Sequence, residues 1–152
     1  MGRLILLTIA YAGMVFGANS GGKPDFSGNW LLNLDKSHFG KSHKPDGMTL
    51  TVKRNGETMH AVQTTQTPGG PMDFAGDWIL DGQQHDYSGP MQGKVVSRWE
   101  GNTLYSERKS NDGSFDQKIY LTLSSDGKTA TEKVITKGTD GTNTATLIWE
   151  RK

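Results

Sequence analysis

Arg108, His85 and Tyr87 are the side chains in this sequence best suited to binding chemistry, because counting along the predicted strands places all three on an inward face. A guanidinium presents a forked pair of donors, so Arg108 is suited to clamp a ligand carboxylate. The alternative is that Arg108, close to a turn at 112–113, reaches solvent. His85 and Tyr87 could orient a polar ligand group, and the alternative is a hydrogen-bonded structural role. No second ligand is spaced with His85 to hold a haem iron or another metal.

Motifs for catalysis and for cofactor binding are missing from the sequence. There is no nucleophile elbow and no glycine-rich phosphate loop after a strand. His38 and His43 lie in a lysine-rich loop whose composition does not favour a metal site, and the chain has no cysteine. We therefore expect no enzyme activity, no metal and no cofactor; a barrel enzyme that uses His85 or Glu132 ranks last among the function classes.

The elements that must position these side chains are short strands. Segment 115–123 alternates apolar and polar residues with a period of two, which is typical of a strand with one dry and one wet face. Asp-Gly turns flank it at 112–113 and 126–127, and this dipeptide suits two-residue hairpin loops. Strands of the same kind are predicted at 30–34, 48–54, 58–65, 72–80, 83–88, 95–99, 103–109, 129–136 and 144–151, and a loop is predicted at 36–47.

About ten strands in hairpin succession, with no helical period, define an all-β chain. A long antiparallel meander either splits into two packed sheets or curls closed, and closure removes both edges. We predict a closed up-and-down antiparallel β-barrel rather than a sandwich.

The turns also predict the register. The loop at 112–113 sets Arg108 opposite Gln117, and a loop at 140–141 would set Glu132 opposite Trp149. A loop at 81–82 would set Trp78 beside His85, and a loop at 55–56 would send His60 outward, opposite Thr51. The predicted interior is mixed: Trp78, Trp99, Ile119, Leu121, Val134, Leu147 and Trp149, with His85, Tyr87, Ser97, Ser106, Arg108, Gln117 and Glu132.

So many polar groups inside a barrel favour a cavity, because each buried polar group needs a partner that water or a ligand can supply. We predict that the interior binds a small, mostly hydrophobic or amphipathic molecule. Its site is predicted from Trp78, His85, Tyr87, Trp99, Arg108, Gln117 and Trp149. The alternative is a filled barrel that acts as a protein-interaction or inhibitory module through Tyr120, Ile135 and Ile148 on its outer face.

Residues 1–17 have the pattern of a cleavable signal peptide: Arg3, then an apolar run that is too short to span a bilayer. A polar spacer at 18–25 and a barrel domain at 26–152 follow. We expect a secreted or periplasmic protein that has no lipid-modified cysteine and no stable membrane insertion once the signal is removed. The 17 Lys and Arg nearly balance the 16 Asp and Glu, which does not recommend nucleic acid as a partner.

The two ends of the barrel sequence resemble the lipocalin and fatty-acid-binding (calycin) superfamily. Phe26-Ser27-Gly28-Asn29-Trp30 is similar to its opening G-x-W motif, and Trp149-Glu150-Arg151 is similar to its final strand. The resemblance implies that Arg151 covers Trp30 and closes one end of the barrel, and in our register Glu132 would neutralise Arg151. Two features depart from the family: segment 36–47 is too short for the helical lid of fatty-acid-binding proteins, and there is no C-terminal helix of secreted lipocalins. The residues with which fatty-acid-binding proteins hold a ligand carboxylate have no clear counterpart on the last strand.

Overall fold

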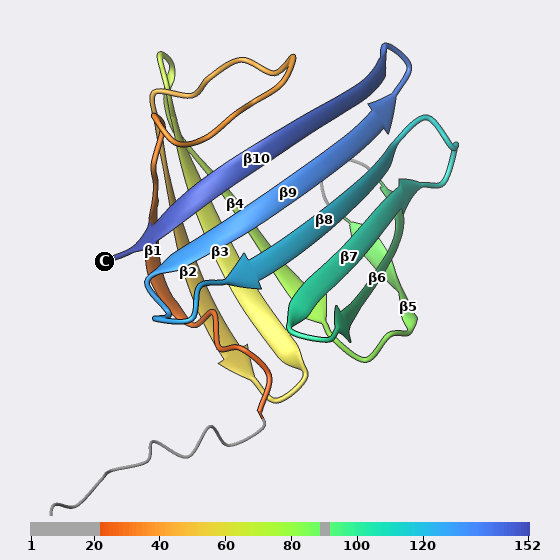
Figure 1. Ribbon diagram of the computed structural model, residues 1–152. Helices are drawn as coiled ribbons and strands as arrows, with labels where there is room; N and C mark the ends of the chain where they lie inside the picture. Colours follow the sequence, from red (N-terminus) through yellow and green to blue (C-terminus); the bar gives the residue numbers. More distant parts are fainter. Residues whose placement is uncertain (1–21, 89–91) are drawn as a thin grey trace, which may run out of the picture.

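The computed structural model describes residues 22–88 and 92–152 as one ten-stranded antiparallel sheet, and these ranges contain no helix (Figure 1). The strands are β1 (Gly28–Leu32), β2 (Gly47–Asn55), β3 (Thr58–Thr67), β4 (Gly70–Ile79), β5 (Gln84–Ser88), β6 (Gln92–Glu100), β7 (Thr103–Ser110), β8 (Asp116–Leu123), β9 (Thr129–Gly138) and β10 (Gly141–Arg151). The predicted all-β fold and strand succession are confirmed. The predicted signal peptide lies outside the described residues.

The sheet curls into a nearly closed barrel in the order β4-β3-β2-β1-β10-β9-β8-β7-β6-β5. Pairing of β1 with β10 joins the first strand to the last, with Trp30 opposite Arg151. Strands β4 and β5 stand at the two ends of this order and do not pair. The expectation of full closure is therefore wrong at one place.

The predicted hairpin that set Trp78 beside His85 is also wrong. The chain leaves β4 at Leu80, whose amide donates to the carbonyl of Glu57 at 2.7 Å, and then crosses to β6, where Gly82 donates to the carbonyl of Ser97 at 2.9 Å. These bonds direct residues 80–83 across the end of the barrel instead of back along β4. Asp81-Gly82 is a turn, but its local geometry does not produce a hairpin.

The register between β6 and β9 is as predicted: Leu104 lies opposite Leu121, and Arg108 lies opposite Gln117. In two other hairpins the pairing is displaced by two residues. The β9–β10 loop falls at 139–140, so Glu132 faces Leu147 and not Trp149. The β2–β3 loop falls at 56–57, so His60 faces Lys53 and not Thr51. A displacement of two keeps each side chain on its predicted face, because alternate residues share a face.

The hydrophobic core fills one end of the barrel, where Phe26, Trp30, Leu104 and Trp149 are almost completely buried. Phe26 lies just before β1 and stacks on Trp99 of β6, with ring centroids 6.2 Å apart. Side chains from both halves of the sheet meet here, so this end is sealed.

Segment 33–46 crosses the opposite end of the barrel as a loop, as predicted. Asn143 of β10 anchors it: its amide nitrogen donates to the carbonyl of Phe39 and to the hydroxyl of Ser42, and its oxygen accepts from the amide of Lys41. The loop thus has a fixed place over the mouth of the barrel without any helix. Among the described residues, no helix is both long enough and apolar enough to cross a membrane.

Candidate functional site

A cavity of about 520 Å³ lies inside the barrel, between the sealed end and the loop at 33–46. Its wall comes from β2, β3, β4, β7, β8, β9 and β10 and from that loop. Ligand pockets in proteins have volumes of roughly 300–1,000 Å³, so this space is large enough for a lipid-sized molecule. The interior is hollow, and the filled-barrel alternative is not favoured.

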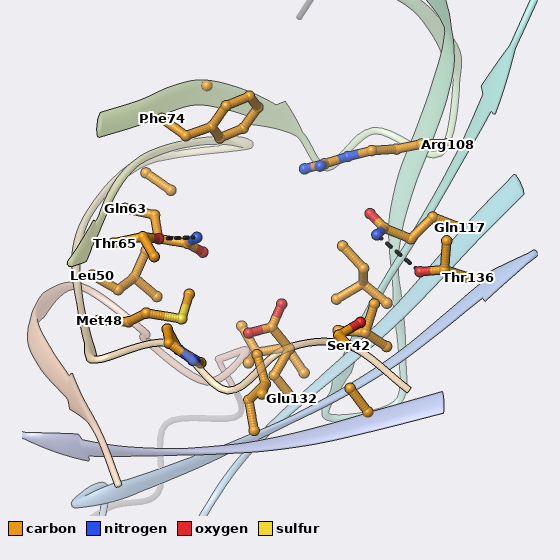
Figure 2. Close-up of a pocket in the computed structure, with 18 of the residues that line it drawn as sticks. Ser42, Met48, Leu50, Gln63, Thr65, Phe74, Arg108, Gln117, Glu132 and Thr136 are labelled. Atoms are coloured by element: carbon orange, nitrogen blue, oxygen red, sulfur yellow. Dashed lines mark hydrogen bonds between the residues drawn. The ribbon is translucent and has the colours of Figure 1, made fainter. Parts of the chain in front are cut away.

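The wall of the cavity has an apolar part and a polar part. Deep in the barrel it is lined by Val52, Met59, Trp78, Ile119 and Leu121. Toward the mouth, amide and hydroxyl side chains pair with one another: Gln63 donates to Thr65 at 3.3 Å, and Gln117 donates to Thr136 at 3.2 Å (Figure 2). Such a surface suits an amphipathic molecule.

Arg108 projects into the cavity from β7, and its charge has no anionic partner in the described part of the chain (Figure 2). The guanidinium lies 5.1 Å from the ring of Trp78 on β4 and 5.1 Å from the ring of Tyr87 on β5. It therefore spans the two strands that leave the barrel open. Its Nε is buried and finds no hydrogen-bond acceptor among the described residues.

Two opposite influences act on the pKa of the Arg108 guanidinium. Burial lowers the pKa of Arg108, while the nearby Tyr87 and Glu132 raise it. Arginine nevertheless stays protonated in proteins. The cavity thus holds a permanent cation that has no ion-pair partner among the described residues, and an anionic group of a ligand would supply that partner.

Glu132 is the second charged residue of the wall, and its carboxyl points into the cavity from β9 (Figure 2). Its Oε2 accepts a hydrogen bond of 2.8 Å from the indole Nε1 of Trp149. Burial raises the pKa of the Glu132 carboxyl, and the bond from Trp149 and the charge of Arg108 offset this only in part. The surface that Glu132 still exposes faces the cavity.

The expected contact between Trp30 and Arg151 is present at the sealed end, where the guanidinium lies 4.3 Å from the centre of the Trp30 ring. Arg151 also donates to the backbone carbonyls of Gly127, Ser27 and Asp25. The expectation that Glu132 neutralises Arg151 is wrong. The two-residue displacement of β9 against β10 moves Glu132 away from Arg151 and into the cavity, where its hydrogen bond is to Trp149.

Of the other residues predicted to form the site, Trp78 and Gln117 line the cavity and Tyr87 contacts Arg108. The structure does not place Trp99, Trp149 or His85 on the cavity wall. Trp99 stacks on Phe26 within the core, and Trp149 is fully buried.

His85 binds Asp81 instead, with its Nε2 3.0 Å from a carboxylate oxygen, and this bond lowers the pKa of Asp81. The pairing suits the hydrogen-bonded structural role left open for His85. His60 points outward as predicted and bonds to Asp77 of β4 at 2.6 Å.

Sequence reasoning missed the part of the wall that comes from β2 and β3 and, apart from Trp78, from β4. Met48, Leu50, Met59, Gln63 and Phe74 all line the cavity. The alternation along 48–54, 58–65 and 72–80 carried that signal, because each of these residues lies on the face opposite His60. The loop residues at the mouth carry no such pattern, because a loop has no period.

The described residues contain no group of three or more His, Asp, Glu or Cys side chains that could hold a metal ion. The charged groups of the cavity are one arginine and one glutamate on different strands. This arrangement can hold a ligand at two polar points and surround the rest of it with apolar side chains.

Comparison with known proteins identifies the fold. No protein-family model matches the sequence, and a search of curated proteins found none with significant similarity. Among solved structures, a secretory abundant heat soluble protein from Ramazzottius varieornatus aligns with a TM-score of 0.63 at 12% identity, over 86% of this chain and 97% of that one. A Schistosoma mansoni fatty acid binding protein in complex with arachidonic acid aligns with a TM-score of 0.58 at 15% identity, over 86% of this chain and 99% of that one.

Zebrafish ileal bile acid-binding protein complexed with cholic acid aligns with a TM-score of 0.56 at 16% identity, over 84% of this chain and 98% of that one. The chain has the calycin fold of the fatty-acid-binding-protein type. At these identities the likeness concerns the backbone. The ligand has to be argued from the residues of this cavity.

Proposed function

We propose that this barrel binds a single small amphipathic molecule, with an apolar body inside the cavity and an anionic group on Arg108. The observation that carries the proposal is the guanidinium of Arg108, which points into a cavity of about 520 Å³ and forms no ion pair among the described residues (Figure 2). A buried charge without a partner is costly, and an incoming carboxylate would form charge-assisted hydrogen bonds with it.

The apolar part of the wall supplies the rest of the binding free energy. Each Å² of apolar ligand surface removed from water contributes about 25 cal/mol before the entropy of binding is subtracted. Trp78, Ile119 and Leu121 would contact the ligand body. Two structural neighbours hold acids, arachidonic acid and cholic acid, which supports an acidic ligand here. These two neighbours are named as binding proteins, and we propose binding and not catalysis for this chain.

We further propose that the protein is exported, because residues 1–17 carry a signal-peptide pattern. Expression of the full chain in its own source, followed by intact mass measurement, tests this. A mature species that starts shortly after residue 17 and appears outside the cytoplasm supports export. An intact N-terminus on a cytoplasmic protein overturns it.

Calorimetric titration of stearate and of octadecanol into the purified barrel tests the binding function. The two ligands share a hydrocarbon chain and differ in the charge of the head group. We expect one stearate per barrel, bound at least tenfold more tightly than octadecanol, because a charge-assisted hydrogen bond contributes about 1.5–3 kcal/mol. Arg108→Met should remove this preference.

Lys109→Met is the matched control, since Lys109 follows Arg108 on β7 and is exposed on the opposite face. It should keep the preference for stearate. Failure of the natural protein to bind either ligand would overturn the proposal, as would an unchanged preference in Arg108→Met. Native mass spectrometry of protein from its own source would then identify any ligand that co-purifies.

A further inference from the structure

Glu132 is a second polar contact point in the cavity that the proposed carboxylate site on Arg108 does not use. Its hydrogen bond among the described residues runs from Trp149 to Oε2, and the carboxyl points into the cavity (Figure 2). The apolar residues that pair with Glu132 on the neighbouring strands are Leu121 and Leu147, and both also line the cavity. A polar group therefore lies in the middle of an apolar wall.

Glu132 lies deeper in the barrel than Arg108. Arg108 pairs with Gln117 on β8, and Gln117 in turn pairs with Thr136 on β9. Glu132 lies four residues nearer the sealed end than Thr136, which is roughly 13 Å along a β-strand, and the long side chain of Arg108 shortens this separation, so that its charge acts on Glu132. A ligand held at Arg108 by one end would reach Glu132 with the middle of its chain.

The charge state of Glu132 determines which group suits it. Burial raises the pKa of this carboxyl. The charged group that faces it from the packed strands is Arg108, and an anionic ligand bound there would cancel the stabilising field of the guanidinium. With ligand bound, the carboxyl is therefore driven further toward its neutral form, in which it can donate a hydrogen bond from one oxygen and accept from Trp149 with the other.

We infer that the cavity selects an amphipathic acid that carries a hydroxyl or keto oxygen near the middle of its hydrocarbon body, held by the carboxyl of Glu132. The inference rests on the proposed function, because it assumes that the acidic end of the ligand lies at Arg108. A plain saturated chain would bury the polar atoms of Glu132 against methylene groups, which is costly. An oxygenated chain gives those atoms a partner.

The test compares stearate with 12-hydroxystearate by calorimetric titration, and the quantity of interest is the ratio of their two dissociation constants within each variant. For the natural protein we expect 12-hydroxystearate to bind about tenfold more tightly than stearate. In Glu132→Gln the amide oxygen can still accept from Trp149 while its nitrogen donates to the ligand, so most of this ratio should remain. In Glu132→Met the ratio should fall to one or below, with stearate binding retained.

Lys133→Met is the matched control, because Lys133 follows Glu132 on β9, is exposed and lies on the opposite face of the strand, outside the cavity wall. It should leave the ratio as it is in the natural protein. Because each ratio is taken within one folded variant, a change in overall stability does not enter it. Circular dichroism and a thermal unfolding curve identify any variant that does not fold, and Glu132→Leu then replaces Glu132→Met.

Three results would overturn the inference. The first is equal binding of stearate and 12-hydroxystearate by the natural protein, which leaves the proposed function standing. The second is an unchanged preference in Glu132→Met. The third is a preference that Glu132→Gln abolishes, because the hydroxyl would then be held by an ionised carboxylate and not by the neutral carboxyl that the inference requires. If the natural protein binds neither stearate nor 12-hydroxystearate, the proposed function and this inference are both overturned.

Discussion

The sealed end and the cavity of this barrel each hold an arginine against a tryptophan, and the two arginines differ in what their donors contact. Arg151 at the sealed end lies over Trp30 and donates to three backbone carbonyls. Arg108 lies between Trp78 and Tyr87, and its buried Nε finds no acceptor among the described residues. The donors of the arginine are thus bonded at the sealed end and partly without an acceptor in the cavity.

The difference separates a structural arginine from a binding arginine. Folding requires partners for buried polar groups, so a guanidinium with three carbonyl partners is part of the fold. A guanidinium without an acceptor lowers stability unless another molecule supplies one. The position of Arg108 beside the cavity, and not its residue type, is what indicates ligand binding.

The largest expected effect is on stability at the sealed end. Arg151→Met should lower the free energy of unfolding by about 3 kcal/mol, because three backbone carbonyls lose their donor and the contact with Trp30 is lost. Urea denaturation followed by tryptophan fluorescence measures this. Arg108→Met should change the same free energy by less than about 1 kcal/mol, or raise it, because it removes an unpaired buried charge. Equal losses of unfolding free energy in Arg151→Met and Arg108→Met would contradict the distinction between a structural and a binding arginine.

A somewhat smaller effect is expected at Gly28, the glycine of the G-x-W motif. Its φ of +134° is unfavourable for other residues, and a Cβ there would lie 2.7 Å from Nη1 of Arg151. Gly28→Ala should therefore destabilise the barrel by about 2 kcal/mol. Gly138→Ala is the control, because a Cβ there meets nothing within 4 Å. The double variant that combines Arg151→Met with Gly28→Ala should lose less free energy of unfolding than the sum of the two single losses. Both substitutions act on the contact of Arg151 with the backbone, so their effects overlap.

The smallest expected effect is a pH dependence that comes from the cavity. The folded-state pKa of Glu132 is raised by burial, so its contribution to stability is fully present below the ordinary glutamate pKa of about 4.3 and is lost as pH rises through the folded value. The stability of the natural protein relative to Glu132→Gln should fall over that interval and then level off. Urea denaturation of both proteins between pH 4 and pH 8 measures it. A relative stability that rises with pH would show that Glu132 is stabilised as an anion.

Much of the fold could be predicted from the sequence because alternation and turn dipeptides are local signals. The turns around β8 set its register with β7 and β9 correctly, and Arg108 was placed inside with Gln117. Thr139 and Asp140 show the limit of this method: the loop begins one residue earlier than the Asp-Gly pair suggests, and the pairing moves by two. The face was still right, since a displacement of two preserves it.

The missing pairing between β4 and β5 and the role of Glu132 could not be predicted, because both depend on contacts between distant strands. Asp81-Gly82 has the composition of a hairpin turn, but hydrogen bonds from Leu80 to Glu57 and from Gly82 to Ser97 hold the chain elsewhere. Glu132 was assigned to Arg151 from an incorrect pairing. No local pattern in the sequence indicates that a carboxyl on β9 meets the indole of Trp149 from inside the barrel.

The most direct test of the contrast between the two arginines is an NMR titration that follows the Nε–H resonances of Arg108 and Arg151 while stearate is added, with each resonance assigned by its loss in the corresponding Arg→Lys variant. We predict that the Arg108 resonance shifts and saturates at one equivalent of stearate while the Arg151 resonance stays in place. Saturable binding of stearate that leaves Arg108 unchanged, or that shifts Arg151 instead, would contradict the proposed role of Arg108.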